Sequence, residues 1–289
     1  MRGIFTAGVL DWLLDEKILF SSVYGVSAGA CHACSYLSGQ RGRAYRVGVD
    51  YLEDKRYCSF ESMLKTGDLF GAQMCYDIIP NQLNPYDYEA FSRYEGAFFA
   101  VVTNCATGQA EYHRITDMHR DVISVRASSS LPLLSRNVRI GDQEYLDGGA
   151  ADSIPVRRSV EDGNQKNVVV LTQAADYRKT PNKMMPLIRV KYRRYPRFIE
   201  TMETRYLKYN ETLEYIRREE EAGRLLVIRP RTTPEIGRIE KNRDKLQALY
   251  EQGYEEAKRN GEKLEAFLGT PDKTVSKTDP SGKFAGLRP

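Results

Sequence analysis

No apolar run in this sequence approaches the ~20 residues that a membrane-spanning helix needs. The most apolar stretch near the start, Ile4 to Leu14, is broken by Asp11 and lacks a small-residue cleavage site, so it makes a poor signal peptide. The sequence has no internal repeat, and its 289 residues include only 22 glycines and 12 prolines. These absences exclude the collagen-like and disordered classes and leave a globular composition.

Cysteine is scarce as well. Five cysteines are an odd number in a chain long enough to bury an ordinary core, which favours reduced thiols and a cytoplasmic protein. Cys31 and Cys34 have the spacing of a metal half-site or a redox pair. No second Cys/His pair at ligand spacing follows them, so packing within a helix is the preferred interpretation, and we expect no metal and no cofactor.

Charge is unevenly distributed along the chain. Residues 176–289 carry 26 basic and 18 acidic side chains, whereas residues 1–175 carry 17 and 21. Residues 178–197 contain eight basic side chains and no acidic one, mixed with apolar residues, as suits the surface of an anionic bilayer. The candidates for membrane contact, at the inner face of a membrane, are Arg189, Lys191, Arg193 and Arg194. The alternative is a solvated connection whose apolar residues pack on the sheet; no nucleic-acid motif is present.

Apolar patterning predicts strands interleaved with helices, and hence an α/β layered fold with a largely parallel sheet. The strand candidates are Ser21–Val26, Ala97–Thr103, Ala110–Arg114, Val138–Leu146, Asn167–Thr172 and Leu225–Arg229. Residues 197–222 and 236–268 predict two long charged helices. We therefore expect a main domain over residues 1–175, a basic helical extension over 176–269 and a disordered tail over 270–289.

Gly25-Val26-Ser27-Ala28-Gly29 has the G-x-S-x-G form and lies between a predicted strand and a predicted helix. That context is typical of a nucleophile elbow, in which the serine occupies a sharp, strained turn. Gly25 and Gly29 would let the strand and the helix pass closely, and the helix N-terminus would favour developing negative charge. The alternative interpretation is a packing turn rich in glycine and alanine.

A serine nucleophile needs a base. The three histidines, His32, His113 and His119, all precede Asp147, whereas an α/β-hydrolase requires the chain order serine, acid, histidine. Structural or surface histidine is therefore the preferred interpretation for all three.

Asp147 ends a strand-like segment and is followed by Gly148 and Gly149, which suits a side chain that reaches a crevice above the sheet. It is the candidate general base for Ser27 in a dyad without histidine; an ordinary turn aspartate is the alternative.

Together these motifs resemble the patatin-like phospholipase family. The resemblance rests on Met1-Arg2-Gly3, the elbow around Ser27, the small-residue and proline segment Ala127 to Pro132, and Asp147-Gly148-Gly149, in that order. It implies a three-layer α/β/α sandwich, a Ser27–Asp147 dyad and hydrolysis of acyl esters of lipids such as phospholipids, without metal or cofactor. Residues 176–270 are similar, with weaker motifs, to the extension of bacterial members.

The sequence departs from the family at its start. The family's first strand and a glycine triplet would precede Arg2, so the sheet is expected to lack that strand. Arg2 and Gly3 would then be left to form the oxyanion hole with the elbow residues Gly25, Ala28 and Gly29. Two functions are therefore considered. The first is a serine acyl hydrolase of the phospholipase or lysophospholipase type. The second is a catalytically impaired protein that binds lipid surfaces or acts as a regulatory binding protein.

Overall fold

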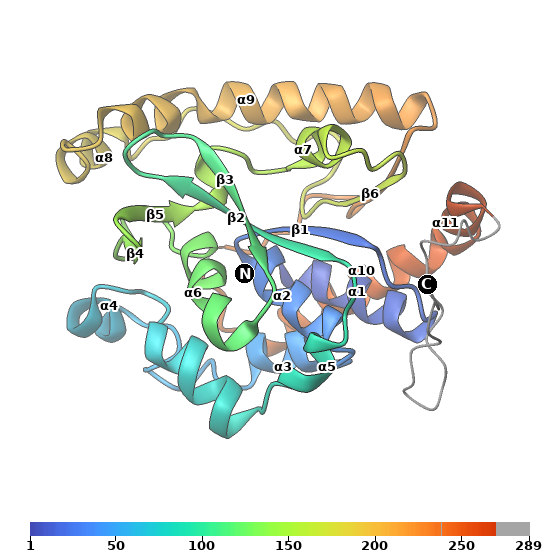
Figure 1. Cartoon of the computed structure of the whole chain (residues 1–289), viewed down its shortest axis with the longest axis horizontal. Helices are drawn as coiled ribbons and strands as arrows, with labels where there is room; N and C mark the ends of the chain where they lie inside the picture. The colour runs from blue at the N-terminus through green and yellow to red at the C-terminus, as the bar shows by residue number, and fades with distance from the viewer. Residues whose placement is uncertain (238, 270–289) are drawn as a thin grey trace.

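The computed structural model describes residues 1–237 and 239–269 and places helices on both faces of a layer of strands (Figure 1). The strands are β1 (Ser22–Val26), β2 (Ala97–Asn104), β3 (Ala110–Ile115), β4 (Val138–Ile140), β5 (Gln143–Asp147), β6 (Asn167–Val170) and β7 (Leu225–Ile228). The helical segments before β6 are α1 (Ile4–Asp15), α2 (Ala28–Leu37), α3 (Arg43–Val49), α4 (Phe60–Thr66), η1 (Met74–Leu83), α5 (Tyr88–Ser92), α6 (Met118–Ser128), η2 (Gly148–Ala150) and α7 (Val156–Glu161). Those after β6 are α8 (Met185–Lys191), α9 (Pro196–Glu221), α10 (Arg243–Arg259) and α11 (Gly261–Leu268).

The layers confirm the predicted α/β/α sandwich. Helices α7 and α9 cover one face of the strands, and α1, α2, α6 and α10 lie on the other (Figure 1). The largest apolar cluster fills the space between the strands and the second set of helices, with Phe5, Leu13, Tyr36 and Phe98 fully buried. The apolar patterning of the sequence thus predicts the layered α/β class correctly. The parallel pairing that it also predicts holds for β1 with β2 and for β6 with β7, whereas the hairpins β2–β3 and β4–β5 are antiparallel.

The strands form two sheets. Strand β2 pairs in parallel with β1 and antiparallel with β3 and β5, and β4 pairs antiparallel with β5. Strands β6 and β7 form a separate parallel pair. Within the described residues, β1 and β6 each have one unpaired edge, and residues of both strands line a common cavity. That the sheet lacks a first strand stays a prediction.

Two predicted elements are each divided in the structure. The single strand expected over residues 138–146 is a hairpin, because Gly141 adopts a positive φ of 60° and turns the chain between β4 and β5. The single helix expected over residues 236–268 is two helices. The Asn242 side chain caps the start of α10 by accepting from the Lys245 amide at 3.0 Å, and the helix ends at Asn260.

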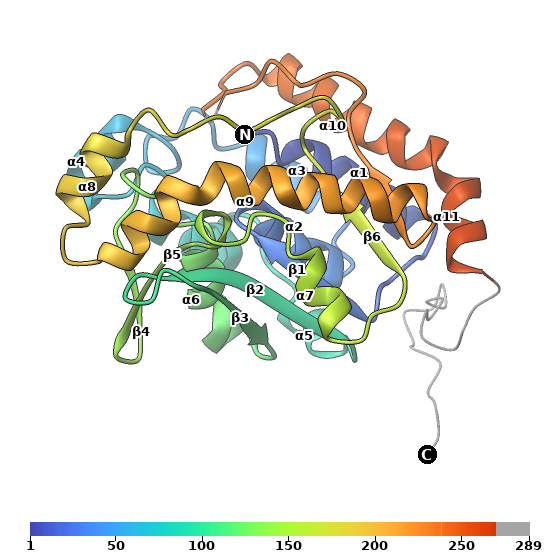
Figure 2. The same ribbon diagram turned by 90° about the horizontal axis from the view of Figure 1, so that it is seen from above.

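The C-terminal part packs closely on the rest of the chain. Strand β7 completes the pair with β6, and α10 crosses α1 so closely that a Cβ at Gly8 or at Gly253 would overlap the backbone of the facing helix. Figure 2 shows α9 running across the molecule and α10 beside α1. The boundaries 1–175 and 176–269 stay a prediction, and the predicted tail 270–289 lies outside the described residues.

None of the helices within residues 1–237 and 239–269 is long and apolar enough to cross a membrane.

Candidate active site

Ser27 occupies a strained turn between β1 and α2. Its backbone angles are φ 56° and ψ −125°, a conformation that a residue with a side chain rarely adopts. A Cβ at Gly25 would lie 2.5 Å from the Cα of Ala30, so only glycine allows the strand to meet the helix there. Gly29 differs from the expectation, because a Cβ there would meet nothing within 4 Å among the described residues. Close packing therefore explains Gly25 but not Gly29.

The pairing of the strands positions Asp147 close to Ser27. Strand β3 occupies one side of β2 along residues 98–103, so β1 and β5 must share the other side, where they meet end to end. The register sets Val26 opposite Val101 and Asp147 opposite Val102. Since successive strand residues are only about 3.3 Å apart, the end of β1 and the end of β5 converge next to Ser27.

The C-terminal end of α6 and the residues directly after it hold both Ser27 and Asp147. The Ser27 amide donates to the Ser128 hydroxyl at 2.9 Å, and the Asp147 amide donates to the Ser130 carbonyl at 2.8 Å. These serines belong to the small-residue segment quoted for the family resemblance. Their roles in fixing the relative positions of the serine and the aspartate are visible only in the structure.

Different structural constraints favour glycine at Gly148 and at Gly149. A Cβ at Gly148 would overlap the carbonyl oxygen of Val101, so the chain can leave β5 there only without a side chain. The Gly149 amide donates to Asp147 Oδ1 at 2.7 Å and so orients the carboxylate, which is buried at 3% exposure. A Cβ at Gly149 would approach that oxygen to 3.0 Å.

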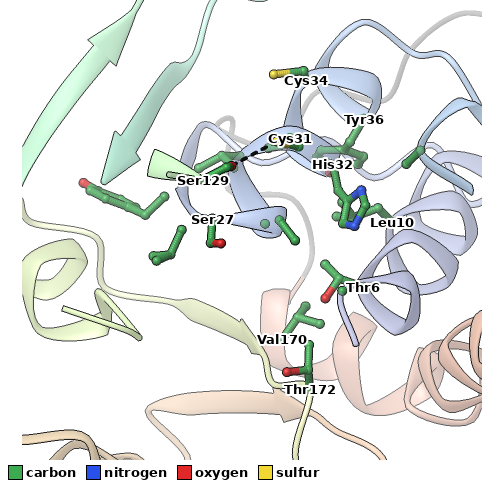
Figure 3. A pocket seen from close by; sticks show the side chains of 18 of the residues that line it. Thr6, Leu10, Ser27, Cys31, His32, Cys34, Tyr36, Ser129, Val170 and Thr172 are labelled. Atoms are coloured by element: carbon green, nitrogen blue, oxygen red, sulfur yellow. Dashed lines mark hydrogen bonds between the residues drawn. The ribbon is translucent and has the colours of Figure 1, made fainter. Parts of the chain in front are cut away.

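Ser27 and Asp147 line one cavity of about 710 Å³, within the range of ligand-binding pockets. Figure 3 shows Ser27 at the start of α2, with Val170 and Thr172 farther along the cavity wall. Arg2 and Gly3 also line the cavity, and a Cβ at Gly3 would lie only 2.7 Å from the Cβ of Ala28. The predicted oxyanion residues Arg2, Gly3 and Ala28 thus gather around the elbow.

The histidines are arranged as the sequence predicts for structural residues. His32 lines the cavity, but its ring lies toward Thr6 and Leu10 (Figure 3), and burial lowers its pKa to about 4 with a smaller effect of the nearby N-terminal charge. His113 contacts the Ser124 hydroxyl at 3.1 Å and Glu111 at 3.2 Å. Neither His113 nor the exposed His119 lines the cavity.

Cys31 and Cys34 do not act as a pair in the described structure. Cys31 Sγ lies 3.2 Å from the Ser129 hydroxyl, as Figure 3 shows, whereas the Cys34 thiol donates to the Ala30 carbonyl at 3.3 Å. Burial raises the pKa of Cys31 above its usual value. All five cysteines are free, and no group of three or more potential metal ligands occurs among residues 1–237 and 239–269.

No pattern in the sequence predicts that the C-terminal part also reaches the site. Arg205 on α9 lines the cavity, and its Nε donates to the carbonyl of Gly149, directly after the Asp147 turn. Tyr209, one turn further along α9, and Lys179 line the cavity as well. One arginine in a long, highly charged helix has no neighbouring motif that could have predicted this role.

The basic segment is only partly free to meet a membrane. Arg189 forms an ion pair with Glu203 at 2.7 Å, and Lys191 donates to the Ser135 carbonyl at 3.2 Å. Arg193 and Arg194 are exposed. The apolar residues of this region also fall into a buried and an exposed group. Ile188, Tyr192 and Phe198 are buried, whereas Met184, Leu187 and Val190 are exposed.

Comparisons with known proteins match parts of the chain to two domain families. The patatin-like phospholipase family matches residues 1–159, and a domain of unknown function, DUF6363, matches residues 195–269. The chain is also 29% identical over 187 residues to the uncharacterized protein YjjU of Escherichia coli (strain K12). That alignment covers 62% of this chain and 51% of YjjU, so the chain spans about half the length of this relative.

A layered α/β fold in which a serine turn between β1 and α2 meets an aspartate at the end of β5 is the arrangement on which the resemblance to the patatin-like class rests. The family match covers more than half of the chain, and the protein therefore belongs to the patatin-like phospholipase family.

Proposed function

We propose that this protein hydrolyses carboxylic esters of phospholipids or lysophospholipids with Ser27 as nucleophile and Asp147 as general base. The observation that carries the proposal is the convergence of β1 and β5 on one side of β2, with both residues tied to the segment Ser128 to Ser130. The strained backbone at Ser27 supports it, because such strain persists where function requires it.

The proposed reaction has two steps. In the first, Asp147 accepts the proton of the Ser27 hydroxyl while Oγ attacks the ester carbonyl carbon, and the proton then passes to the departing alcohol as the acyl-enzyme forms. In the second, Asp147 takes a proton from water, which attacks the acyl carbon and releases the fatty acid, and Ser27 recovers its proton. The amides at the start of α2 would bind the oxyanion in both steps.

The cavity suits an acyl chain. Its wall includes apolar residues from β1, α2 and β6, among them Val23, Ala33 and Val170. Basic side chains at its C-terminal wall, Lys179 and Arg205, would favour a lipid that carries a phosphate or carboxylate. We also propose that the exposed Arg193 and Arg194 contact anionic lipid at the inner membrane face.

The direct test is hydrolysis of a long-chain p-nitrophenyl ester and of a phospholipid by the parent protein and by Ser27→Ala. Alanine fits the elbow as well as serine does, so the variant is expected to keep its melting temperature and lose turnover by ~10³-fold or more. Turnover that survives in a folded Ser27→Ala protein would contradict the serine mechanism. A parent protein that binds lipid but hydrolyses none of these esters would instead be a lipid-binding member of the family.

A further inference from the structure

Two short helices at one end of the molecule expose large apolar side chains. On α4, Phe60 and Leu64 are 72% and 88% exposed. On α8, Leu187 and Val190 are 55% and 69% exposed, and Met184, just before that helix, is 46% exposed. We call these five side chains the apolar end surface.

Helical spacing puts the exposed residues of each helix on one outward face. Phe60 and Leu64 are four residues apart, and Leu187 and Val190 are three apart, so each pair lies one turn apart. The inward residues of the same helices are buried, Ser62 on α4 among them. The exposed large apolar side chains thus lie on one face of each helix, away from the buried Ser62 of α4 and Ile188 of α8.

The two helices are joined through one loop. Arg136 donates its amide to Asp68 at 2.9 Å, just after α4, and its side chain covers Gly67, the residue that ends α4. The neighbouring Ser135 accepts from Lys191, the last residue of α8. Both figures show α4 and α8 at the same end of the molecule (Figures 1 and 2). The two helices therefore flank one loop at the same end of the molecule.

Other exposed apolar side chains among the described residues occur singly on different elements. They are Leu83, Ile123, Val160, Leu207 and Ile239. Single exposed apolar residues are normal on proteins, whereas a group on adjoining elements marks an interaction site.

The charges around the apolar end surface are mainly basic. On the α4 side, Lys55 and Lys65 share a single acid, Glu61, at 3.1 and 2.6 Å. Near α8, Arg193 and Arg194 have no acidic group within ion-pair distance in the part of the chain that the structure describes. Apolar side chains that enter the acyl region, flanked by basic ones that stay with the headgroups, match the surface of an anionic bilayer.

We propose that the apolar end surface docks the protein on an anionic lipid bilayer, with the side chains of α4 and α8 inserted between the lipids. This surface deepens the proposed function, since a phospholipid hydrolase has to meet its substrate in a bilayer. The segment that links the helices begins at the site, because Leu131 lines the catalytic cavity and Leu134 accepts from the Leu69 amide beyond α4. The segment beside the proposed docking surface thus also contributes to the wall of the cavity.

The experiment measures binding to vesicles, with all proteins carrying Ser27→Ala so that no lipid is consumed. Sedimentation with vesicles of phosphatidylcholine and phosphatidylglycerol compares that parent with Phe60→Ser/Leu64→Ser and with Leu187→Ser/Val190→Ser. Each pair is expected to weaken binding by about tenfold or more, since each removes two apolar side chains from the bilayer. The matched control Val160→Ser/Leu207→Ser, at exposed apolar positions outside this surface, is expected to bind like the parent.

A second measurement does not depend on removing any apolar group. The chain has one tryptophan, the buried Trp12, so Leu64→Trp adds a second at the centre of the proposed contact. Its fluorescence is expected to shift to the blue and to be quenched by brominated lipid, whereas that of Val160→Trp is not.

Equal binding by parent and serine variants, or an unshifted Leu64→Trp spectrum on bound vesicles, would overturn the proposal. So would the finding that the surface holds two copies of the chain together, with a dimer that the same substitutions abolish and no vesicle binding. Because binding is measured without turnover, a failure here leaves the hydrolysis of soluble esters unaffected, and a failure of hydrolysis leaves the vesicle result intact.

Discussion

The two walls of the catalytic cavity are built by different means. In the wall from residues 1–159, backbone turns at Ser27 and Gly148 fix the geometry, and close approach of main chains dictates the residue types. In the wall from the C-terminal part, long side chains such as Arg205 and Tyr209 reach in from α9. Under the proposed mechanism, the first wall would hold the reacting groups, whereas the second would position them and contact the substrate.

The largest effect is expected at the reacting pair in the first wall. Asp147→Asn keeps the shape of the side chain but removes the base, and it should lower kcat by ~10³-fold or more. If the two residues act as a unit, Ser27→Ala/Asp147→Asn should be no less active than the less active of the two single variants. Initial rates with a p-nitrophenyl ester measure both quantities. Losses that multiply in the double variant would show that the two residues act separately.

The next largest change in activity is expected at the unpaired edges of β1 and β6, two strands that line the cavity. A strand followed by Gly-Gly-Gly, fused ahead of Met1, is expected to pair with β1 and β6 and to add amides to the oxyanion hole. We expect kcat to rise by ~10²-fold, the usual effect of such donors, and the melting temperature to rise as well. The same strand followed by Ala-Ala-Ala is the control, and it should raise the melting temperature alone. Unchanged values for both fusions would mean that the cavity does not accept a strand.

A smaller loss of activity is expected from a substitution in the second wall. Arg205 donates to the Gly149 carbonyl, and the Gly149 amide holds Asp147, so Arg205→Met should disturb the carboxylate without removing it. Loss of one such hydrogen bond predicts a fall in kcat of about tenfold with little change in KM for a small neutral ester. Lys208→Met, on the same helix but exposed, is the matched control. A loss as large as that of Asp147→Asn would erase the distinction between the walls.

The smallest effect on turnover is expected from the histidines. His32→Gln, His113→Gln and His119→Gln should each retain most of the activity, and a loss equal to that of Ser27→Ala would replace the dyad with a Ser-His mechanism. Stability is different at His32, where burial lowers the pKa from 6.5 to about 4. As the pH falls below 6.5, His32 is protonated in the unfolded chain but stays neutral in the folded one until the pH approaches 4. The free energy of unfolding therefore falls as the pH drops from 6.5 towards 4. Denaturation with urea across that range should show a shallower fall in His32→Gln.

The sequence predicts the first wall better than the second, for a physical reason. A strained turn or a close main-chain contact admits few residue types, so Gly25-Val26-Ser27 and Asp147-Gly148 leave a recognisable pattern. The contact from Arg205 depends on where a long helix lies in space, and no local pattern records it. The division at Gly141 was missed because apolar residues on both sides of that turn resemble one continuous strand.

The close crossing of α1 and α10 has a consequence for the order in which the molecule forms. Gly8 and Gly253 let the two backbones touch, and Tyr250 donates to the buried Asp11 at 2.7 Å across 239 residues of sequence. Helix α1 starts at the turn of Arg2 and Gly3 beside the elbow, so its final position depends on a helix that the ribosome makes more than 200 residues later. Contacts of such long sequence separation form slowly. During synthesis, we therefore expect Ser27 to leave the ribosome well before α10 but to reach its final geometry only after α10 has followed.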